Sequence, residues 1–453
     1  VYSAEWSIFL PLFAILWWRL AESFYEAVAT LPTELAELGS SLKLTSWQFF
    51  WTIECPYALP LLISKMTLTM AEAWFVLIFM EGFLCGRGLA SSGGIGAYAY
   101  TAAELSNAPA LCAVVCIMLF VLVCYDQLIG RPLTAWSRRF VVINAISERL
   151  TDPWFLRFLR RNQTFEAFAI KQRKLWHCFA LLPLGGTQVK YNKALLSEAD
   201  VPNRASWLVF ILWGAVGLLG GALALLLSNH SYSIDVYGNI LVRGCVSLAR
   251  IILMLCISSL VWVPIGVYVG TKPAYSRIGL GIAQYFAVYP ANLLYPLFAM
   301  VFIATHRSVE VWGAPLLIFG GQWAIFSAVL AGMRALPSSV LDVSKNFQVR
   351  GWLLWRKILL PALLPYYFVG LGTASASAWT AMFAVETLSW GHVSLQSFGL
   401  GAYIFNAANT GEVSSALSGI CIMTLMLMVT NLLFWQPITR FVCRVFKITD
   451  RTA

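Results

Sequence analysis

Ionisable side chains inside apolar stretches are the residues of this chain best placed to do chemistry. Arg19, Glu22 and Glu26 share one such stretch at spacings of three and four, which puts them on one face of a helix. Glu72 and Arg250 lie in two others. A charge at membrane depth is costly unless it is paired or lines a polar route. We therefore expect Arg19 or Arg250 to line a polar path, where it could offer a positive charge to an anion; the alternative is that Arg19 belongs to a self-neutralised cluster near the cytoplasmic end.

Glu72 needs a separate explanation, because a bare carboxylate on such a path would repel any anion that the arginine attracts. We expect it to be protonated or paired with Arg19 or Arg250. Asn292 and Gln322 are neutral hydrogen-bonding candidates on the same path. Trp74 and Trp379 could act as gates, although packing is the commoner role of such residues.

The sequence offers no catalytic machinery of its own. It has no G-x-x-x-x-G-K-[ST] motif, so energy from ATP would have to come from a separate ATPase. Its ten cysteines include no C-x-x-C pair, and Cys112 and Cys116, which share a helix face, are better explained by packing. We expect no catalytic residues, no metal site and no cofactor.

The elements that hold these residues are membrane spans. The chain is 59% hydrophobic and 11% charged, whereas about a quarter of the residues of a soluble domain are charged. Runs long enough to cross about 30 Å of hydrocarbon predict an all-α membrane protein with nine spans. They are residues 7–30, 57–83, 108–128, 206–228, 247–270, 279–304, 313–334, 362–388 and 415–436.

The net charge of +10 is concentrated in the predicted cytoplasmic segments. Residues 131–204 hold thirteen Lys or Arg against five Asp or Glu, and the loops at 272–277, 345–357 and 440–451 are also basic. The loops predicted to lie on the external side of the membrane carry little charge. By the positive-inside rule this excess indicates orientation and lipid contact, not nucleic-acid binding. Residues 154–165, WFLRFLRRNQTF, fit either a helix on the membrane surface or a solvated basic linker.

A shift of 305 residues superimposes one part of the chain on another without a gap. Residues 31–81 match 336–386, and the later match of GGIGAY at 93–98 with FGLGAY at 398–403 extends the repeat. Such a repeat predicts two like units around a pseudo-twofold pore. Glu81 and Glu386 recur at the external ends of equivalent spans, where we expect them to anchor the loops that follow.

We therefore divide the chain into a first permease unit at 1–130, a basic cytoplasmic linker at 131–204 and a second permease unit at 205–453. The first unit has three spans and the second has six. We expect the three missing spans to lie ahead of Val1 in the complete protein, which would then have twelve; a natural half-unit is the alternative.

Each copy also contains a loop suited to docking on another protein. A short helix and a polar turn lead to Trp47 in one copy and Trp352 in the other, and a proline pair beginning at Pro56 or Pro361 opens the next span. Proline fits the first turn of a helix, so the pair fixes where the span starts. The expected product is a short helix that projects into the cytoplasm and fits a groove.

This loop resembles the coupling loop of bacterial ABC importer permeases. The usual pattern of that loop is E-A-A, then three residues, G, nine further residues and I-x-L-P. Glu37 and Asp342 take the acidic place, and the proline place is taken by Pro56 and Pro361. The alanines are replaced by Leu38, Gly39, Val343 and Ser344, and the glycine by Lys43 and Gln348. If that turn requires a positive φ, each replacement costs about 1 kcal/mol.

The stretches at 248–273 and 286–297 and the GGIGAY and FGLGAY pair resemble the nitrate, taurine and bicarbonate permeases with two fused units. The resemblance implies an ABC importer permease of the bacterial inner membrane that carries a small anion. It implies two ATPase subunits, bound at Glu37, Trp47, Pro56, Asp342, Trp352 and Pro361, and an external binding protein. The alternatives are a fused permease for ferric iron or thiamine, which an acidic path at Glu72 would favour, and an ion-coupled secondary transporter.

Overall fold

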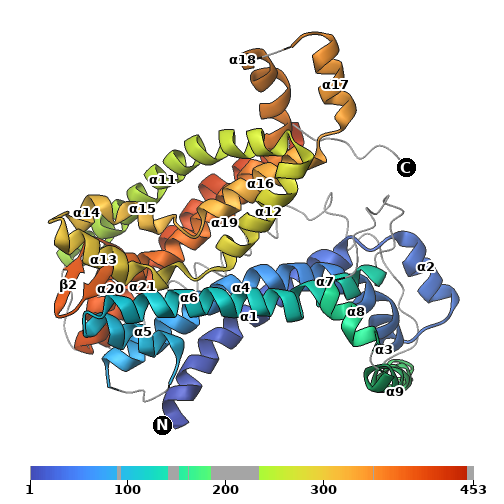
Figure 1. Ribbon diagram of the computed structural model, residues 1–453, viewed down its shortest axis with the longest axis horizontal. Helices are drawn as coiled ribbons and strands as arrows, with labels where there is room; N and C mark the ends of the chain where they lie inside the picture. Colours follow the sequence, from blue (N-terminus) through green and yellow to red (C-terminus); the bar gives the residue numbers. More distant parts are fainter. Residues whose placement is uncertain are drawn as a thin grey trace. The chain divides into compact units, whose positions relative to one another are not determined.

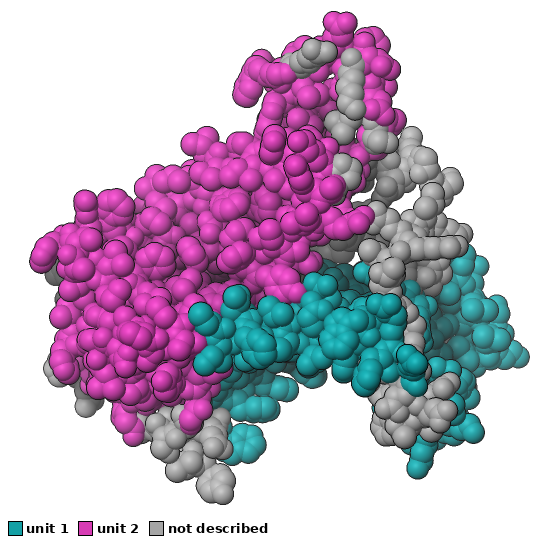
Figure 2. Space-filling model, in the orientation of Figure 1, with its two compact units in different colours: residues 1–77, 116–207 teal, residues 78–115, 208–453 magenta. Residues whose placement is uncertain are grey.

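The computed structural model describes residues 2–88, 93–140, 153–161, 163–184, 234–349 and 351–445. These form two compact units, residues 1–77 with 116–207 and residues 78–115 with 208–453 (Figure 2). The division into permease units and linker made from the sequence stays a prediction.

The first compact unit is entirely helical over its described residues (Figure 1). Its elements are α1 (Tyr2–Ala29), α2 (Thr33–Ser41), α3 (Ser46–Phe49), a π-helical turn (Phe50–Glu54), most of α4 (Cys55–Gly86), the last part of α6 (Ala108–Tyr125), a second π-helical turn (Asp126–Gly130), α7 (Arg131–Ser137), a 3-10 turn (Arg138–Phe140), α8 (Trp154–Arg161) and α9 (Gln163–Ala180).

The second compact unit contains the remaining helices and one small hairpin. Its elements are the end of α4, α5 (Ile95–Glu104), the start of α6, α11 (Ile234–Gly270), α12 (Pro273–Val288), a 3-10 turn (Ala291–Leu293), α13 (Tyr295–Ala304), α14 (Val309–Trp312), α15 (Ala314–Leu317), α16 (Gln322–Ala335), α17 (Ser338–Asn346), α18 (Gly351–Leu354), a π-helical turn (Trp355–Leu359), α19 (Leu360–Val385), β1 (Thr387–Trp390), β2 (Val393–Gln396), α20 (Leu400–Thr410), α21 (Val413–Thr430), a π-helical turn (Asn431–Trp435) and α22 (Gln436–Val445).

Seven described helical segments are long and apolar enough to span a membrane, and a bent pair makes an eighth. They agree with eight of the nine spans predicted from the sequence, and the ninth, residues 206–228, lies outside the described residues. The predicted span at 279–304 is not continuous, because α12 and the helical segment Ala291–Ala304 meet at 67°. Pro290 explains the break: it has no backbone N–H, and it holds Tyr289 in an extended conformation (φ −67°, ψ 126°).

The 305-residue repeat is confirmed element by element. The predicted coupling loop of the first copy, which consists of α2, α3 and the first π-helical turn, corresponds to α17, α18 and the turn at Trp355–Leu359 with identical bounds after the shift. Helices α4, α5 and α6 correspond to α19, α20 and α21, and the π-helical turn after α6 recurs after α21. We call residues 1–140 the first copy and 306–445 the second copy.

The copies differ where glycine and proline enter the second one. The segment matching the single helix α1 is broken into α14, α15 and α16. Gly313, Pro315, Gly320 and Gly321 stand there in place of Ile8, Leu10, Ile15 and Leu16, and such residues interrupt a helix. Further along, β1 and β2 form an antiparallel hairpin in which Trp390 pairs with Val393, and Gly391 turns the chain at φ 60°.

Candidate transport and coupling sites

The two coupling loops have the same backbone. Each short helix, α2 or α17, ends in a tight turn whose central residue has a positive φ, 50° at Lys43 and 53° at Gln348. These are the positions where the sequence carries no glycine. The turn therefore does require the left-handed conformation, which costs an L-residue about 1–2 kcal/mol.

The entry to each following span is also the same in both copies. Pro56 and Pro361 each follow a π-helical turn, Phe50–Glu54 or Trp355–Leu359. A proline cannot donate to the carbonyl four residues earlier and crowds it, so the helix widens by one residue ahead of the ring. The prolines thus set the direction in which each coupling loop leaves its span.

Each coupling helix presents two apolar side chains to solvent at positions i and i+4. They are Leu38 in α2 and Leu42 directly after it, 49% and 60% exposed, and Val343 in α17 and Phe347 directly after it, 52% and 78% exposed. These pairs occupy equivalent positions in the repeat. Exposed apolar residues on one face of a projecting helix fit a groove on a partner. Within these two helices we identified only Glu37 and Asp342 from the sequence as contacts for a partner, although the i, i+4 spacing of the apolar residues was visible in the sequence.

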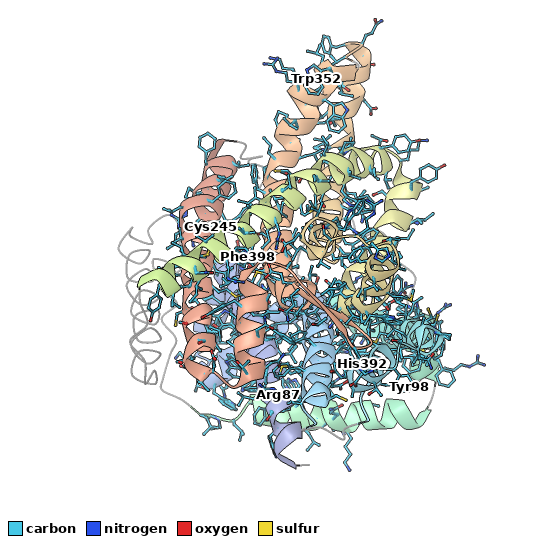
Figure 3. All side chains as sticks on the ribbon, turned by 90° about the vertical axis from the view of Figure 1, so that its left-hand side faces the viewer. Arg87, Tyr98, Cys245, Trp352, His392 and Phe398 are labelled. Carbon is cyan, nitrogen blue, oxygen red and sulfur yellow. The ribbon has the colours of Figure 1, made fainter. Side chains whose placement is uncertain are left out.

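The residues predicted to bind an ATPase lie on these loops. Glu37 and Asp342 are exposed on α2 and α17, and Trp352 is 77% exposed on α18. Figure 3 shows Trp352 near the tip of the limb that α17 and α18 form in the second compact unit. Trp47 is only partly exposed, because its indole N–H donates to Phe179 O of α9 at 3.1 Å.

The predicted pairing of Glu72 is confirmed. Arg19 Nη2 lies 2.8 Å from Glu72 Oε1, and Arg19 Nε lies 3.3 Å from Oε2, so the contact is bidentate. Glu22 is 3.7 Å from the same guanidinium. About two turns from the Arg19–Glu72 pair, Glu26 pairs with Lys65 at 3.3 Å. Two ion pairs therefore join α1 to α4 along one seam.

The second copy replaces this charged seam with small residues. Arg19, Lys65 and Glu72 correspond to Ala324, Gly370 and Ser377. A Cβ at Gly370 would lie 2.9 Å from Ala324 O, so α16 and α19 pack backbone against backbone there. Small residues allow such close helix packing in a membrane.

Arg250, the other arginine predicted for the path, is mostly buried in an ionic network. It lies 3.6 Å from Glu386 Oε1 and also pairs with Glu310, and it donates to Ser397 Oγ at 3.3 Å. Glu386 in turn accepts from Ser247 Oγ at 2.6 Å. This arrangement gives Arg250 a structural role at the start of α20.

Glu386 anchors the loop that follows it, as the repeat predicted. Its Oε2 accepts the backbone N–H groups of Gly401 at 2.7 Å and Ala402 at 3.1 Å, in the first turn of α20. Glu81 accepts the N–H of Gly96 at 2.7 Å in the first copy. A carboxylate at a helix N-terminus is favoured by the unsatisfied N–H groups and the helix dipole.

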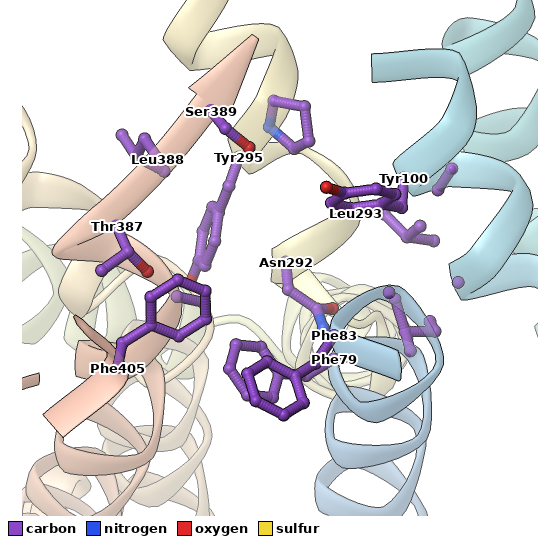
Figure 4. Close-up of a pocket in the computed structure, with 16 residues that line it drawn as sticks. Phe79, Phe83, Tyr100, Asn292, Leu293, Tyr295, Thr387, Leu388, Ser389 and Phe405 are labelled. Carbon is purple, nitrogen blue, oxygen red and sulfur yellow. The ribbon is translucent and has the colours of Figure 1, made fainter. Parts of the chain in front are cut away.

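A cavity in the second compact unit is the best candidate for a solute site. It consists of two adjoining pockets of about 140 and 700 Å³ that share Gly82, Phe83, Tyr100, Thr387, Leu388, Ser389 and Phe405. The smaller pocket, which Asn292 also lines, is shown in Figure 4. The bend between α12 and α13 brings Asn292 to this wall. Of the residues predicted for the path, Asn292 is the one that lines the cavity.

The larger pocket is rich in groups that stabilise an anion. Thr387, Ser389, Ser394 and Tyr100 supply hydroxyls, Gln396 and Asn409 supply amides, and Arg87 supplies a positive charge. None of the described lining residues is acidic.

One feature positions Arg87 in the larger pocket, and another keeps the Tyr100 hydroxyl protonated. Arg87 stacks on Phe83 at 5.0 Å and donates to Ala408 O. Burial, then the nearby Glu104 and Cys85, raises the pKa of Tyr100, so its hydroxyl stays protonated and able to donate.

The remaining predicted path residues lie within helix packing. Gln322 Oε1 accepts from Trp262 Nε1 at 3.1 Å, next to stacked aromatic rings of α12 and α16. Trp379 is buried in α19. Trp74 Nε1 is buried and has no hydrogen-bond partner among the described residues. We missed Arg87, Tyr100 and the hairpin hydroxyls because they lie in loops and on α5, outside the spans that we searched.

Comparison with known proteins identifies the family of this chain. Residues 1–129 and 241–435 match the model of the binding-protein-dependent transport system inner membrane component, and the chain belongs to this family. It is therefore a multi-pass inner membrane component, as the apolar helices indicate.

The chain is also similar to named permeases. It is 26% identical over 168 residues to the bicarbonate transport system permease protein CmpB of Synechocystis sp., covering 37% of this chain and 57% of that one. It is 24% identical over 187 residues to the nitrate import permease protein NrtB of Leptolyngbya laminosa, covering 41% of this chain and 63% of that one. The chain thus spans less than two thirds of the length of these relatives.

Proposed function

We propose that this chain is the permease subunit of an ATP-driven importer of a small inorganic anion, of the size and charge of bicarbonate or nitrate. An external binding protein delivers the anion, and ATPase subunits bind at the two coupling loops. The names of the relatives support this substrate class. So do the cavity residues, because its lining contains hydroxyls, amides and one arginine but no described acidic side chain.

The cavity lining is the observation that carries the proposal. An anion that leaves water loses hydration worth many kcal/mol, which hydrogen-bond donors and a positive charge must replace. Arg87, Tyr100 and the hydroxyls of the β1–β2 hairpin are suited to that task. A route for ferric iron would need carboxylates instead.

The ion pair of Glu72 argues against the iron or thiamine alternative. That alternative depended on Glu72 as an acidic path residue, and Arg19 neutralises it through two contacts. Arg19 then has a carboxylate partner of its own and is a weaker candidate for the anion path than Arg87. Asn292 keeps its proposed role as a neutral donor, since it lines the smaller pocket.

Coupling to ATP hydrolysis is supported by the match between the two loops. Both copies hold the same turn, the same proline entry and the same pair of exposed apolar residues. Closure of two ATPase subunits would move both coupling helices together and alternate the access of the path.

Uptake by the full-length permease, with its ATPase and binding protein in vesicles, tests the substrate class. Arg87→Gln should raise the KM for labelled bicarbonate or nitrate about tenfold or more, since a hydrogen bond to a charged group contributes about 1.5–3 kcal/mol. Arg307→Gln is the matched control, because Arg307 also stacks on an aromatic ring, Trp312 at 5.1 Å, but does not line the cavity. Equal KM values for the two variants, or uptake of a cation only, would contradict the proposal.

A further inference from the structure

The basic linker predicted at residues 131–204 carries a helix, α9, that is attached to the first coupling loop. Trp47 Nε1 donates to Phe179 O at 3.1 Å, and Gln48 Nε2 donates to Leu181 O at 3.0 Å. These carbonyls lie at the C-terminal end of α9, where a helix leaves its last carbonyls without internal partners. The coupling loop supplies the donor to Leu181 O and a second donor to Phe179 O, which also accepts from Leu182 N at 3.3 Å, so the attachment of α9 is specific.

Aromatic packing reinforces the attachment. The Trp51 ring lies 5.0 Å from that of Trp176 and 5.3 Å from that of Phe179, both edge to face. Aromatic pairs of this geometry add about 0.5–1.5 kcal/mol each beyond the area they bury. In Figure 1, α9 lies beside α3, and all the residues involved belong to the first compact unit.

The second coupling loop differs at the same positions. Trp352, which matches Trp47, is 77% exposed, and the residue that matches Trp51 is the exposed Arg356. Even with α9 attached, Leu38 in α2 and Leu42 at its C-terminal end stay exposed. Helix α9 therefore leaves the coupling helix accessible and extends the surface beside it.

The charges of the two loops show what α9 adds. Residues 33–54 contain three glutamates and one lysine, whereas residues 338–359 contain one aspartate and four Lys or Arg. The first loop is thus acidic and the second is basic. Helix α9 carries three basic residues and one glutamate, and its Lys171, Arg173 and Lys174 are exposed.

We propose that α9 is part of the docking surface for one ATPase subunit, and that Lys171, Arg173 and Lys174 bind an acidic patch of that subunit beside the first coupling helix. Arg356 and Lys357 play the same part on the second loop. The inference rests on the proposed function, since its partner is the ATPase. It explains how two copies of one ATPase can bind loops of opposite charge: α9 supplies the basic residues that the first loop lacks.

The test uses the full-length permease and the ATPase subunit that copurifies with it. The triple variant K171E/R173E/K174E should weaken binding at one of the two positions about tenfold at low salt, because charges at an interface rim act on association and its salt dependence. Native mass spectrometry should then show one ATPase bound where the unaltered protein binds two. The control is R138E/R139E, which changes two exposed arginines in the same compact unit.

A second variant separates the charge of α9 from its attachment. Trp176→Ala removes the ring that contacts Trp51 and leaves every charge in place. It should also lower the occupancy of one position, because α9 must be held beside α3 to act.

Variants of the coupling helices distinguish a failure of the α9 proposal from a failure of the proposed coupling function. If Leu42→Ala and Phe347→Ala weaken ATPase binding but the triple variant behaves like R138E/R139E, the role of α9 is overturned and the coupling function stands. If neither helix variant changes ATPase binding, the coupling function itself is wrong. Tighter binding by the triple variant would also refute the proposal, since it would make α9 an obstacle.

Discussion

Adding one methyl group at Gly399 should destabilise the second copy severely. A Cβ there would overlap the carboxyl group of Glu386, so that carboxylate would have to move. It would then give up its bonds with Gly401 N at 2.7 Å, Ala402 N at 3.1 Å and Ser247 Oγ at 2.6 Å. Since Gly399 is extended, at φ −159°, the effect is steric and not conformational.

The magnitude follows from the lost bonds. Each hydrogen bond to a charged group contributes about 1.5–3 kcal/mol, and a buried carboxylate that loses its partners costs about 3–5 kcal/mol in all. We therefore expect Gly399→Ala to lower the free energy of unfolding by about 3–5 kcal/mol. Gly94→Ala, where the same overlap threatens a single described bond from Gly96 N to Glu81, should cost about 1.5–3 kcal/mol.

Thermal melts of the purified protein in detergent check this order, with Gly372→Ala as the control. A Cβ at Gly372 meets nothing within 4 Å, and the residue lies inside α19, so alanine there should be neutral or stabilising. A double-mutant cycle gives the stricter test. In a Glu386→Ala background Gly399→Ala should cost almost nothing further, because the overlapping group is gone. Additive effects of the two changes would refute the steric argument.

Three other predictions concern single positions. Lys43→Gly and Gln348→Gly should each raise the free energy of unfolding by about 0.5–1 kcal/mol. The free energy gained by relieving the left-handed strain in the folded state exceeds the free energy lost to the greater entropy of the unfolded chain, and a lower melting temperature would contradict this. Arg19→Ala should destabilise the chain, and the double change with Glu72→Ser, which copies the second copy, should recover most of the loss in the same melts. Burial raises the pKa of Glu54, so its ionised form opposes folding as the pH rises through that pKa. Glu54→Gln should stabilise the protein at pH 8 and much less at pH 5.

The sequence predicted those features that depend on local chemistry. The prolines of the repeat required the same helix starts in both copies, so the bounds of α2 and α3 and the start of α4 recur in α17, α18 and α19. The pairing of Glu72 followed from the cost of an unpaired carboxylate among apolar residues. The anchoring role of Glu386 followed from its recurrence ahead of two matched glycine-rich helix starts.

The cavity could not be predicted in the same way. Arg87 and Tyr100 come from a loop and a short helix of the first copy, and Ser389 comes from a hairpin of the second. No spacing in the sequence relates these residues, because packing alone brings them together. The turn of the hairpin shows this dependence: Gly391 N donates to Ala103 O of α5 at 2.8 Å. The two residues lie far apart in the sequence, and nothing in either segment identifies the other.

The two copies agree in some features and differ in how their neighbouring helices are held together. The coupling turns and the glutamate anchors are the same in both, whereas the α1–α4 seam is held by ion pairs and the α16–α19 seam by Gly370 against Ala324. A seam of small residues fixes the helix separation through contact and is insensitive to charge. A seam of ion pairs fixes it through groups that need each other to remain ionised. Substitutions that remove a charge should therefore loosen the helix pair of the first copy, while the helix pair of the second copy responds only to changes in volume.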